Sequence, residues 1–361
     1  MNTYLDVYMF FLALVFLFLM IIAVIPGKKI KYAAKNYNPK VLVIMPCKGT
    51  DIKLGDNLKS AQDQTYKSYK FITVVASKSD EALKAIHATK TDYILANKKY
   101  SKGSGKVTNL ASAMAKYTNY DIYVILDSDV LVSRNWLELL IRPFSDKSIG
   151  LSTAFPVFEP IGGIWSKVKH SWGYVGFGLM ENERTRFGWG GSLAFRKELL
   201  KGNAFNYFAE SISDDIALTK IAKRLKFKIA YVPEANPIVY TNDNFQQFVE
   251  WSTRQTAFSI AGSNKILYYG IAFYSANVLL LVSGIVLGIA VNPILFALLL
   301  PFVLNAAKAY KRSKSLHVLA IYPFINFVYL FNLLKASTMR SVKWRGRTYD
   351  ISKIPKTEIK I

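Results

Sequence analysis

The chain has 361 residues, 52% of them hydrophobic, and its 47 Lys and Arg against 24 Asp and Glu give a formal net charge of +23. This apolar share excludes a wholly disordered protein, and the length suits one large domain or two ordinary ones. A single cysteine, Cys47, excludes an internal disulfide framework and a multi-thiolate metal site, and three histidines far apart in the sequence argue against a zinc centre. We therefore expect any metal to be held by oxygen ligands.

The first predicted element is a membrane anchor within residues 1–27. Residues 7–25 carry no charge, and this stretch is close to the roughly 20 residues that cross a bilayer as a helix. A cleaved signal peptide is the alternative, but no basic residue precedes the stretch. Lysines without any acid follow it, at Lys28, Lys29, Lys31, Lys35 and Lys40. We expect membrane lipids on the cytoplasmic side to face this cluster, and no nucleic acid, because no nucleic-acid module signature is present.

Residues 40–255 are predicted to form an α/β domain. Short apolar runs at 41–45, 71–76 and 122–126 alternate with polar or helix-compatible segments. Such runs are typical of parallel strands that are covered on both faces. A succession of strand, helix and strand favours a doubly wound fold, which binds ligands beyond the carboxyl ends of its strands.

Acidic residues follow each of these predicted strands. Asp51 and Asp80 come after the first and second strands, and Asp127 and Asp129 after the third. Side chains at i and i+2 of an extended segment share a face, so the last two carboxylates predict a site for one hard divalent cation and the diphosphate that it bridges. Because Asp is also common in turns, a purely structural role is the alternative.

Two further segments suggest chemistry. The glycine-lysine loop 102–106 precedes a predicted helix and can cradle phosphate, although it does not match a Walker A motif and a solvated turn is the alternative. Residues 188–196 predict a glycine-rich turn that enters a strand. Asp214 and Asp215 begin an amphipathic helix, where acids serve either as ordinary helix-terminal partners or, in a cleft, as a general base.

The C-terminal third is predicted to return to the membrane. Residues 266–307 contain 42 positions without charge, interrupted at Asn292-Pro293, which predicts two spanning helices with a tight turn. Residues 316–335 form a third hydrophobic or interfacial helix, broken by Pro323. A basic tail follows at 336–361, and the number of membrane spans stays open.

Taken in order, these motifs resemble glycosyltransferase family 2 enzymes of the GT-A fold, most closely the ceramide glucosyltransferase-like branch. The resemblance covers about residues 40–255. It is carried by VLVIMPCKGTDIKLGDNLKSAQDQTY, GKVTNLASAM, VILDSDV, FGWGGSLAFRKELL and SDDIALTKIAKRLKF. It implies a GT-A-type nucleotide-sugar-binding domain with flanking transmembrane helices.

The resemblance also implies roles for individual residues. Asp80 would contact the uracil or ribose side of a nucleotide sugar, with Lys106 and Asn109 near the nucleotide. Asp127 and Asp129 would bind the diphosphate and its Mn²⁺ or Mg²⁺. Asp215 would deprotonate the acceptor hydroxyl, with Asp214 beside it.

The family's Gln/Arg-x-x-Arg-Trp element is altered in this chain. It is present as Gln247 to Trp251, with Glu250 at the position where Arg is usual. Arg254, one helical turn further on, is the expected substitute for the missing cation, and Trp251 the expected donor contact. An interfacial aromatic is the alternative role of Trp251.

The implied activity is that of a membrane-bound, inverting, nucleotide-sugar-dependent glycosyltransferase. We expect a multi-pass protein with a cytoplasmic catalytic domain that transfers a hexose from a UDP-sugar to a lipid hydroxyl, with glucose as the expected hexose. A polyprenyl-phosphate sugar synthase and a polysaccharide synthase are alternatives within the same class. A non-catalytic membrane scaffold with a nucleotide-binding domain is the alternative from another class.

Overall fold

The computed structural model describes residues 3–25, 30–32 and 37–354. Two compact units contain them: a helical unit, formed by residues 1–27, 162–175 and 242–340, and a sheet unit, formed by residues 28–161, 176–241 and 341–361.

These units cut across the segments expected from the sequence. Residues 162–175 and 242–255 group with the apolar helices instead of the α/β domain, and the part of the basic tail after Arg340 groups with the sheet. Of the predicted juxtamembrane lysines, Lys28, Lys29 and Lys35 lie outside the described residues, as do residues 355–361 of the tail.

The sheet unit is built on a seven-stranded mixed sheet of order β3-β2-β1-β4-β8-β6-β9. In that order the strands are Tyr93–Leu95, Tyr69–Val75, Val41–Pro46, Ile122–Leu126, Ser192–Arg196, Ile149–Thr153 and Lys228–Tyr231. The strand predictions near 41–45, 71–76 and 122–126 are confirmed, and β1 pairs in parallel with both β2 and β4. The sheet departs from an all-parallel arrangement at β8, which runs antiparallel to β4 and β6.

Helices cover this sheet because each offers an apolar face to it. Their bounds are α2 Leu54–Gln62, α3 Ala82–Ala88, α4 Gly105–Lys116, α5 Trp136–Ile141, α7 Asn203–Ala209 and α8 Asp214–Arg224. One core cluster joins Leu42 of β1, Leu110 of α4, Phe208 of α7 and Leu218 of α8, all completely buried. Each such side chain contributes about 1.5–3 kcal/mol through its removal from water, so the starts of α4 and α8 are held firmly against the sheet.

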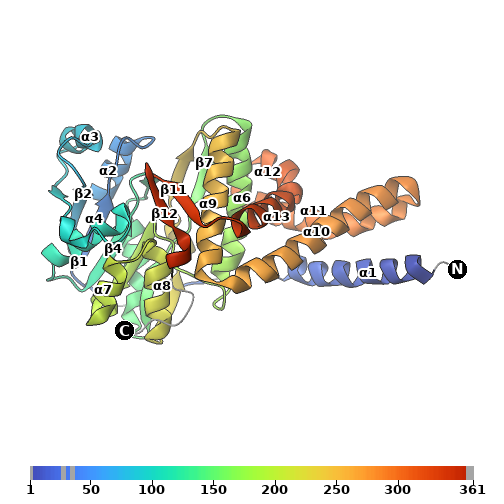
Figure 1. The fold of residues 1–361 in the computed structure, drawn as a ribbon, viewed down its shortest axis with the longest axis horizontal. Coiled ribbons are helices and arrows are strands. Elements are labelled where there is room, and N and C mark those ends of the chain that lie inside the picture. Colours follow the sequence, from blue (N-terminus) through green and yellow to red (C-terminus); the bar gives the residue numbers. More distant parts are fainter. Residues whose placement is uncertain (1–2, 26–29, 33–36, 355–361) are drawn as a thin grey trace. The chain divides into compact units, whose positions relative to one another are not determined.

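Two small β-structures complete the sheet unit. A three-stranded sheet has the order β5-β10-β7, formed by Val130–Leu131, Ile238–Thr241 and Val157–Pro160. A hairpin of β11 (Ser341–Trp344) and β12 (Arg347–Asp350), red in Figure 1, follows the last helix. We call this segment, residues 341–350, the tail hairpin. Its two turn residues, Arg345 and Gly346, have φ of 47° and 75°, the combination of positive angles that a type I′ turn requires.

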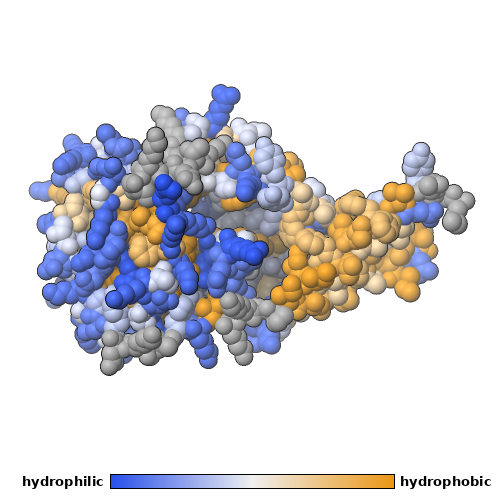
Figure 2. All heavy atoms as spheres, turned by 90° about the horizontal axis from the view of Figure 1, so that it is seen from below, coloured by the Kyte–Doolittle hydropathy of each residue, from blue (hydrophilic) through white to orange (hydrophobic). Residues whose placement is uncertain are grey.

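The helical unit contains α1 (Thr3–Val24), α9 (Phe245–Gly262), α10 (Asn264–Ala290), α11 (Leu300–Ser313), α12 (Leu316–Ile321) and α13 (Ile325–Ser337), while α6 (Ile164–Glu181) gives residues to both units. In Figure 1, α1 lies beside α10 and α11. Leu12 and Leu19 of α1 are buried with Leu280 of α10 and Phe302 of α11. Figure 2 shows hydrophobic side chains gathered on the outer surface of these helices.

Within the part of the chain that the structure describes, four helical stretches are suited by length and composition to cross a membrane: 4–24, 264–290, 293–313 and 316–337. The predicted break at Asn292-Pro293 is confirmed, because α10 ends at Ala290 and the Asn292 side chain caps a 3₁₀ segment, Pro293–Leu299, that leads into α11. The fourth stretch is interrupted by a 3₁₀ turn at Tyr322–Phe324, around Pro323, as expected for a proline inside a helix.

Candidate active site

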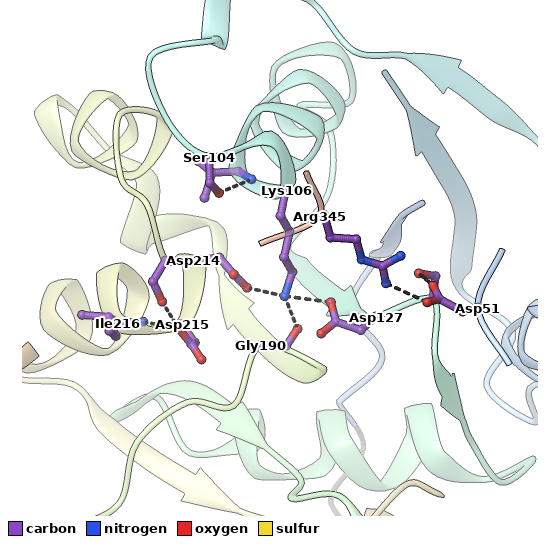
Figure 3. Close-up of polar contacts among 12 residues, drawn as sticks. Asp51, Ser104, Lys106, Asp127, Gly190, Asp214, Asp215, Ile216 and Arg345 are labelled. Atoms are coloured by element: carbon purple, nitrogen blue, oxygen red, sulfur yellow. Dashed lines mark hydrogen bonds and ion pairs between the residues drawn. The ribbon is translucent and has the colours of Figure 1, made fainter. Parts of the chain in front are cut away.

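Acidic side chains gather at one edge of the seven-stranded sheet. Because β2, β1 and β4 are parallel neighbours, their carboxyl ends lie side by side, and the loops after them carry Asp80, Asp51 and Asp127. The sequence-based expectation that these three strand ends adjoin is confirmed by the strand order. Figure 3 shows Asp51 and Asp127 in this region together with residues from α4, α8 and the tail hairpin.

A pocket of about 370 Å³ opens beside the ends of β1 and β2. It is lined by Lys48, Gly49, Ser77, Ser79, Asp80, Glu81 and Arg345. Asp80 is held in place by its Oδ1, which accepts hydrogen bonds from the backbone N–H of Gly49 at 2.8 Å and of Ala82 at 3.0 Å. Gly49 has a φ of +68°, which favours glycine and lets the loop after β1 turn toward Asp80.

Lys106 is the centre of a buried charge cluster. Its Nζ lies 2.7 Å from Asp127 Oδ1 and 3.1 Å from Asp214 Oδ2, and it donates to the Gly190 carbonyl at 3.2 Å (Figure 3). Burial disfavours the charged ammonium, but the nearby carboxylates outweigh this effect and raise the pKa of Lys106. We refer to Lys106, Asp127, Asp214 and Gly190 as the lysine cluster.

Local sequence explains why Lys106 reaches this position. Ser104 is the N-cap of α4, and its hydroxyl accepts a hydrogen bond from the N–H of Val107 at 3.2 Å. The helix therefore begins at Gly105, and Lys106 lies in its first turn, facing the end of β4. The predicted helix after the glycine-lysine loop is confirmed.

Asp214 and Asp215 have different surroundings although they are adjacent. Asp214 is only 3% exposed, and a Cβ placed on Gly190 would lie 2.5 Å from its Oδ2. An acceptor substrate therefore has no space between Gly190 and the Asp214 carboxylate. Burial raises the pKa of Asp214 to about 7, against the opposing attraction of Lys106. Asp215 is partly exposed, and its Oδ1 accepts hydrogen bonds from the Ser213 hydroxyl and the Ile216 N–H. Of the two, Asp215 is the carboxylate that a substrate can reach.

Asp127 and Asp129 suit a hard divalent cation by the chemistry of their donors. Among the described residues, no group of three or more His, Cys, Asp or Glu is placed to hold a metal ion. Two carboxylates from one tight turn therefore leave most coordination positions to other oxygens. Mg²⁺ is commonly bound in this way, by one or two carboxylates together with substrate phosphates and water, so the residues present fit a cation that arrives with a diphosphate.

Arg345 is a site residue that was not singled out from the sequence. Its Nη2 lies 2.7 Å from Asp51 Oδ1, and its Nη1 donates to the Lys48 carbonyl at 2.6 Å. The sequence of residues 342–349 resembles a tail common among membrane-bound members of the family, with a basic anchor at the lipid headgroups as the alternative, and neither interpretation assigned a role to Arg345. The signal that separates Arg345 from its neighbours is the dipeptide Arg345-Gly346 between two alternating runs, which is a hairpin-turn position.

Asn109 lies behind the site. It is 4% exposed, and its Nδ2 donates to the Val74 carbonyl at 3.0 Å, which ties α4 to β2. Its Oδ1 is buried and has no hydrogen-bond partner among the described residues. Its contact with the end of β2 positions the strand that leads to Asp80.

The remaining predicted residues, Gln247, Trp251 and Arg254, lie on α9 in the helical unit. Gln247 forms a capping box with Asn244, because each side chain accepts a hydrogen bond from the other's backbone N–H. The Lys169 ammonium lies 4.2 Å from the centroid of the Trp251 ring. These contacts give Gln247 and Trp251 structural roles, and a donor contact for the three residues stays a prediction.

Comparisons with known proteins agree with this fold. A mannosyltransferase from Pyrobaculum calidifontis, solved with GDP-Man and Mn²⁺, is 18% identical and superimposes with a TM-score of 0.52 over 92% of this chain and 94% of its own. Glucosyl-3-phosphoglycerate synthase from Mycobacterium tuberculosis, solved with Mn²⁺, UDP-Glc and phosphoglyceric acid, is 16% identical over 62% of this chain and 79% of its own, with a TM-score of 0.43. The first similarity shows a shared GT-A fold, and the second is too weak to support a conclusion.

Comparisons by sequence identify the family. No curated protein sequence matches the chain. The model of glycosyl transferase family 21 matches residues 8–357, nearly the whole chain. The expected GT-A glycosyltransferase is thereby confirmed, while the narrower assignment to family 2 stays a prediction. Since the match covers both the acid-bearing sheet edge and the apolar helices, the chain belongs to glycosyl transferase family 21 and is a glycosyltransferase.

Proposed function

We propose that this enzyme transfers a hexose, most simply glucose, from a UDP-sugar to the hydroxyl group of a lipid, with inversion at the anomeric carbon. The observation that carries the proposal is a chain of contacts: the pocket beside Asp80 is lined by Arg345, which Asp127 influences electrostatically, and Lys106 joins Asp127 to Asp214, the neighbour of Asp215. A nucleoside in the pocket would place its diphosphate toward Asp127 and its sugar toward α8.

Each carboxylate has a distinct task in this reaction. Asp80, fixed by two backbone N–H groups, would bind the nucleoside in the pocket. Asp127 and Asp129 would hold Mn²⁺ or Mg²⁺, which when bound supplies Lewis-acid stabilisation of the leaving diphosphate. Asp215 would take the proton from the acceptor hydroxyl as its oxygen attacks the anomeric carbon. No covalent intermediate is required, and the configuration of the sugar inverts.

Lys106 holds two of the acidic residues at this sheet edge, Asp127 and Asp214, in position. Its ammonium lies between two carboxylates in a buried site, where electrostatic interactions are stronger than in water. It therefore holds Asp127 of the donor side and Asp214 of the acceptor side at a fixed separation. This pre-organisation matters because a displacement reaction needs both reactants in line.

The lipid acceptor and the cytoplasmic orientation rest on the apolar helices. Among the described residues, four stretches suited to cross a membrane belong to the same chain as the catalytic residues, which they would anchor to a lipid bilayer. The lysines after the first helix favour the cytoplasmic side for the residues that follow.

The test is a transfer assay with the full-length protein in detergent. Radiolabelled UDP-glucose is offered with extracted membrane lipids, with Mn²⁺ and with a chelator, and GDP-mannose is run in parallel. We expect metal-dependent label in a lipid product whose linkage is inverted relative to the donor. Label in polyprenyl phosphate or in a polymer would assign one of the alternative acceptors. Absence of metal-dependent transfer from either donor to any lipid or glycan would contradict the proposal and favour a scaffold.

A further inference from the structure

The tail hairpin contributes one residue of its turn to the lining of the proposed donor pocket. Arg345 lines this pocket together with Lys48, Gly49 and Asp80. Its guanidinium contacts the Lys48 carbonyl and the Asp51 carboxylate, and the Lys48 ammonium donates in return to the Arg345 carbonyl. Reciprocal hydrogen bonds therefore hold the turn against the loop after β1.

The far strand of the tail hairpin is fastened to α4. The Tyr349 hydroxyl accepts a hydrogen bond from the N–H of Gly105, the first residue of that helix, at 3.3 Å. Tyr349 also lines a second cavity, of about 480 Å³, together with Ser213 and Ile216 of the segment that opens α8. The hairpin thus extends from the pocket at Asp80 to the neighbourhood of Asp215.

The turn itself is unusual for its residue type. Type I′ turns favour Asn, Asp or Gly at their first central position, but this one has a long charged side chain with φ of 47°. Residues other than glycine that are held at positive φ occur often at ligand-binding sites, where surrounding contacts keep them in place. In this turn the contacts are those of the Arg345 guanidinium with Lys48 and Asp51.

The Arg345 guanidinium is stabilised as a cation by nearby carboxylates and is still accessible to a ligand. Partial burial disfavours its charged form, but the carboxylates of Asp51, Asp129 and Asp127 outweigh this effect and raise its pKa. The side chain is still 37% exposed, so a ligand in the pocket can reach it. A guanidinium has five N–H donors, and its bonds to Lys48 and Asp51 leave capacity for phosphate oxygens.

We propose that Arg345, carried on the turn of the tail hairpin, binds the diphosphate of the nucleotide sugar. The proposal rests on the proposed function. Arg345 would hold the diphosphate together with the cation that Asp127 and Asp129 would bind. Its planar fork suits phosphate better than a lysine ammonium does.

The decisive variant is Arg345→Asn. Asn-Gly is a favoured type I′ pair, so this change should keep or raise the thermal midpoint of the ligand-free protein while it removes the guanidinium. Binding of UDP with Mn²⁺ to the full-length protein in detergent is measured by calorimetry. We expect the Kd to rise about 10- to 100-fold, the effect of losing a charge-assisted hydrogen bond, and Arg345→Lys to fall in between.

Matched controls separate a donor contact from a general charge effect. Lys343→Ala removes a positive charge from an exposed position of the same hairpin and should leave the Kd for UDP within about twofold of wild type. UMP, which lacks the second phosphate, should lose less affinity than UDP in Arg345→Asn.

Each outcome is informative. Equal UDP affinity in Arg345→Asn and wild type would overturn the role of Arg345 and leave the proposed function standing. A lowered thermal midpoint in Arg345→Asn with unchanged UDP affinity would assign the residue to structure alone. A wild-type protein that binds neither UDP nor GDP in the presence of Mn²⁺ would contradict the proposed function and this proposal together.

Discussion

Two charged clusters border the sheet edge, and their cations differ in access to water. The side chain of Lys106 is 11% exposed, between Asp214 at 5% and Asp127 at 31%, whereas Arg345 beside the pocket is 37% exposed and its partner Asp51 is 14% exposed. Charges that are removed from water depend on one another, because losing one partner leaves the other unpaired in a medium of low polarity. Charges near water can exchange partners at small cost. The lysine cluster is therefore part of the framework, and the Arg345 pair is open to a ligand.

The largest expected effect follows from breaking the buried cluster. Lys106→Met leaves Asp127 and Asp214 without the ammonium between them, which should destabilise the protein by about 3–5 kcal/mol. Thermal unfolding of the purified protein in detergent measures the change. The control is Lys102→Met, whose ammonium pairs with Glu210 while 77% exposed, and which should have little effect. Equal midpoints for the two variants would contradict the distinction between the clusters.

Asp215→Asn tests the chemical step without disturbing the framework. We expect kcat to fall by about a hundredfold or more, because the variant no longer accepts the proton of the acceptor hydroxyl, while the thermal midpoint stays close to wild type. Steady-state transfer assays provide the measurement, with Asp92→Asn on the surface as the control. If the variant keeps more than about a tenth of the activity, another group must act as the base.

The pH dependence of stability should reveal the burial of Asp214. Its pKa is raised to about 7, whereas an Asp in the unfolded chain titrates near 3.9. Between these values the folded protein binds a proton that the unfolded chain releases, so the stability that this group contributes is greatest at low pH and is lost as the pH rises toward 7. The thermal midpoint of wild type relative to Asp214→Asn should therefore decline from pH 5 to pH 8. A flat or rising difference would show that Lys106 keeps this carboxylate ionised throughout.

The smallest effect is expected at the exposed pair. Asp51→Asn removes the charge that faces Arg345 but keeps a hydrogen-bonding oxygen, and it should change stability by less than about 1 kcal/mol. The thermal midpoint is again the measurement. A loss as large as that of Lys106→Met would mean that the pocket side is as rigid as the lysine cluster.

The elements that the sequence predicted well are those defined by local patterns. β4 follows from an uninterrupted apolar run, α4 from the glycine-lysine loop ahead of a helix-forming segment, and α8 from paired acids before an amphipathic stretch. Because parallel strands share the direction of their carboxyl ends, the approach of Asp80 to the loop after β1 also followed from the expected topology.

The features that escaped prediction depend on contacts between distant positions. Nothing in the sequence of the loop from Lys102 to Lys106 specifies that the Lys106 ammonium is buried between Asp127 and Asp214. The antiparallel direction of β8 arises from its pairing with β4 and β6, which a single strand pattern does not encode. Arg345 could not be told apart from the other basic residues of the tail, because the contact that distinguishes it is with Lys48, 297 positions away in the sequence.

That separation has a consequence for biosynthesis. Ribosomes release the chain from its amino terminus, and domains tend to fold in that order. The loop at Lys48 emerges early, but the hairpin that adds Arg345 to the same pocket leaves only after the apolar helices of the described residues have been made. A nascent or prematurely terminated polypeptide would thus lack Arg345 in the lining of this pocket, and under the proposed role of Arg345 the enzyme would bind its donor fully only when membrane insertion is nearly complete.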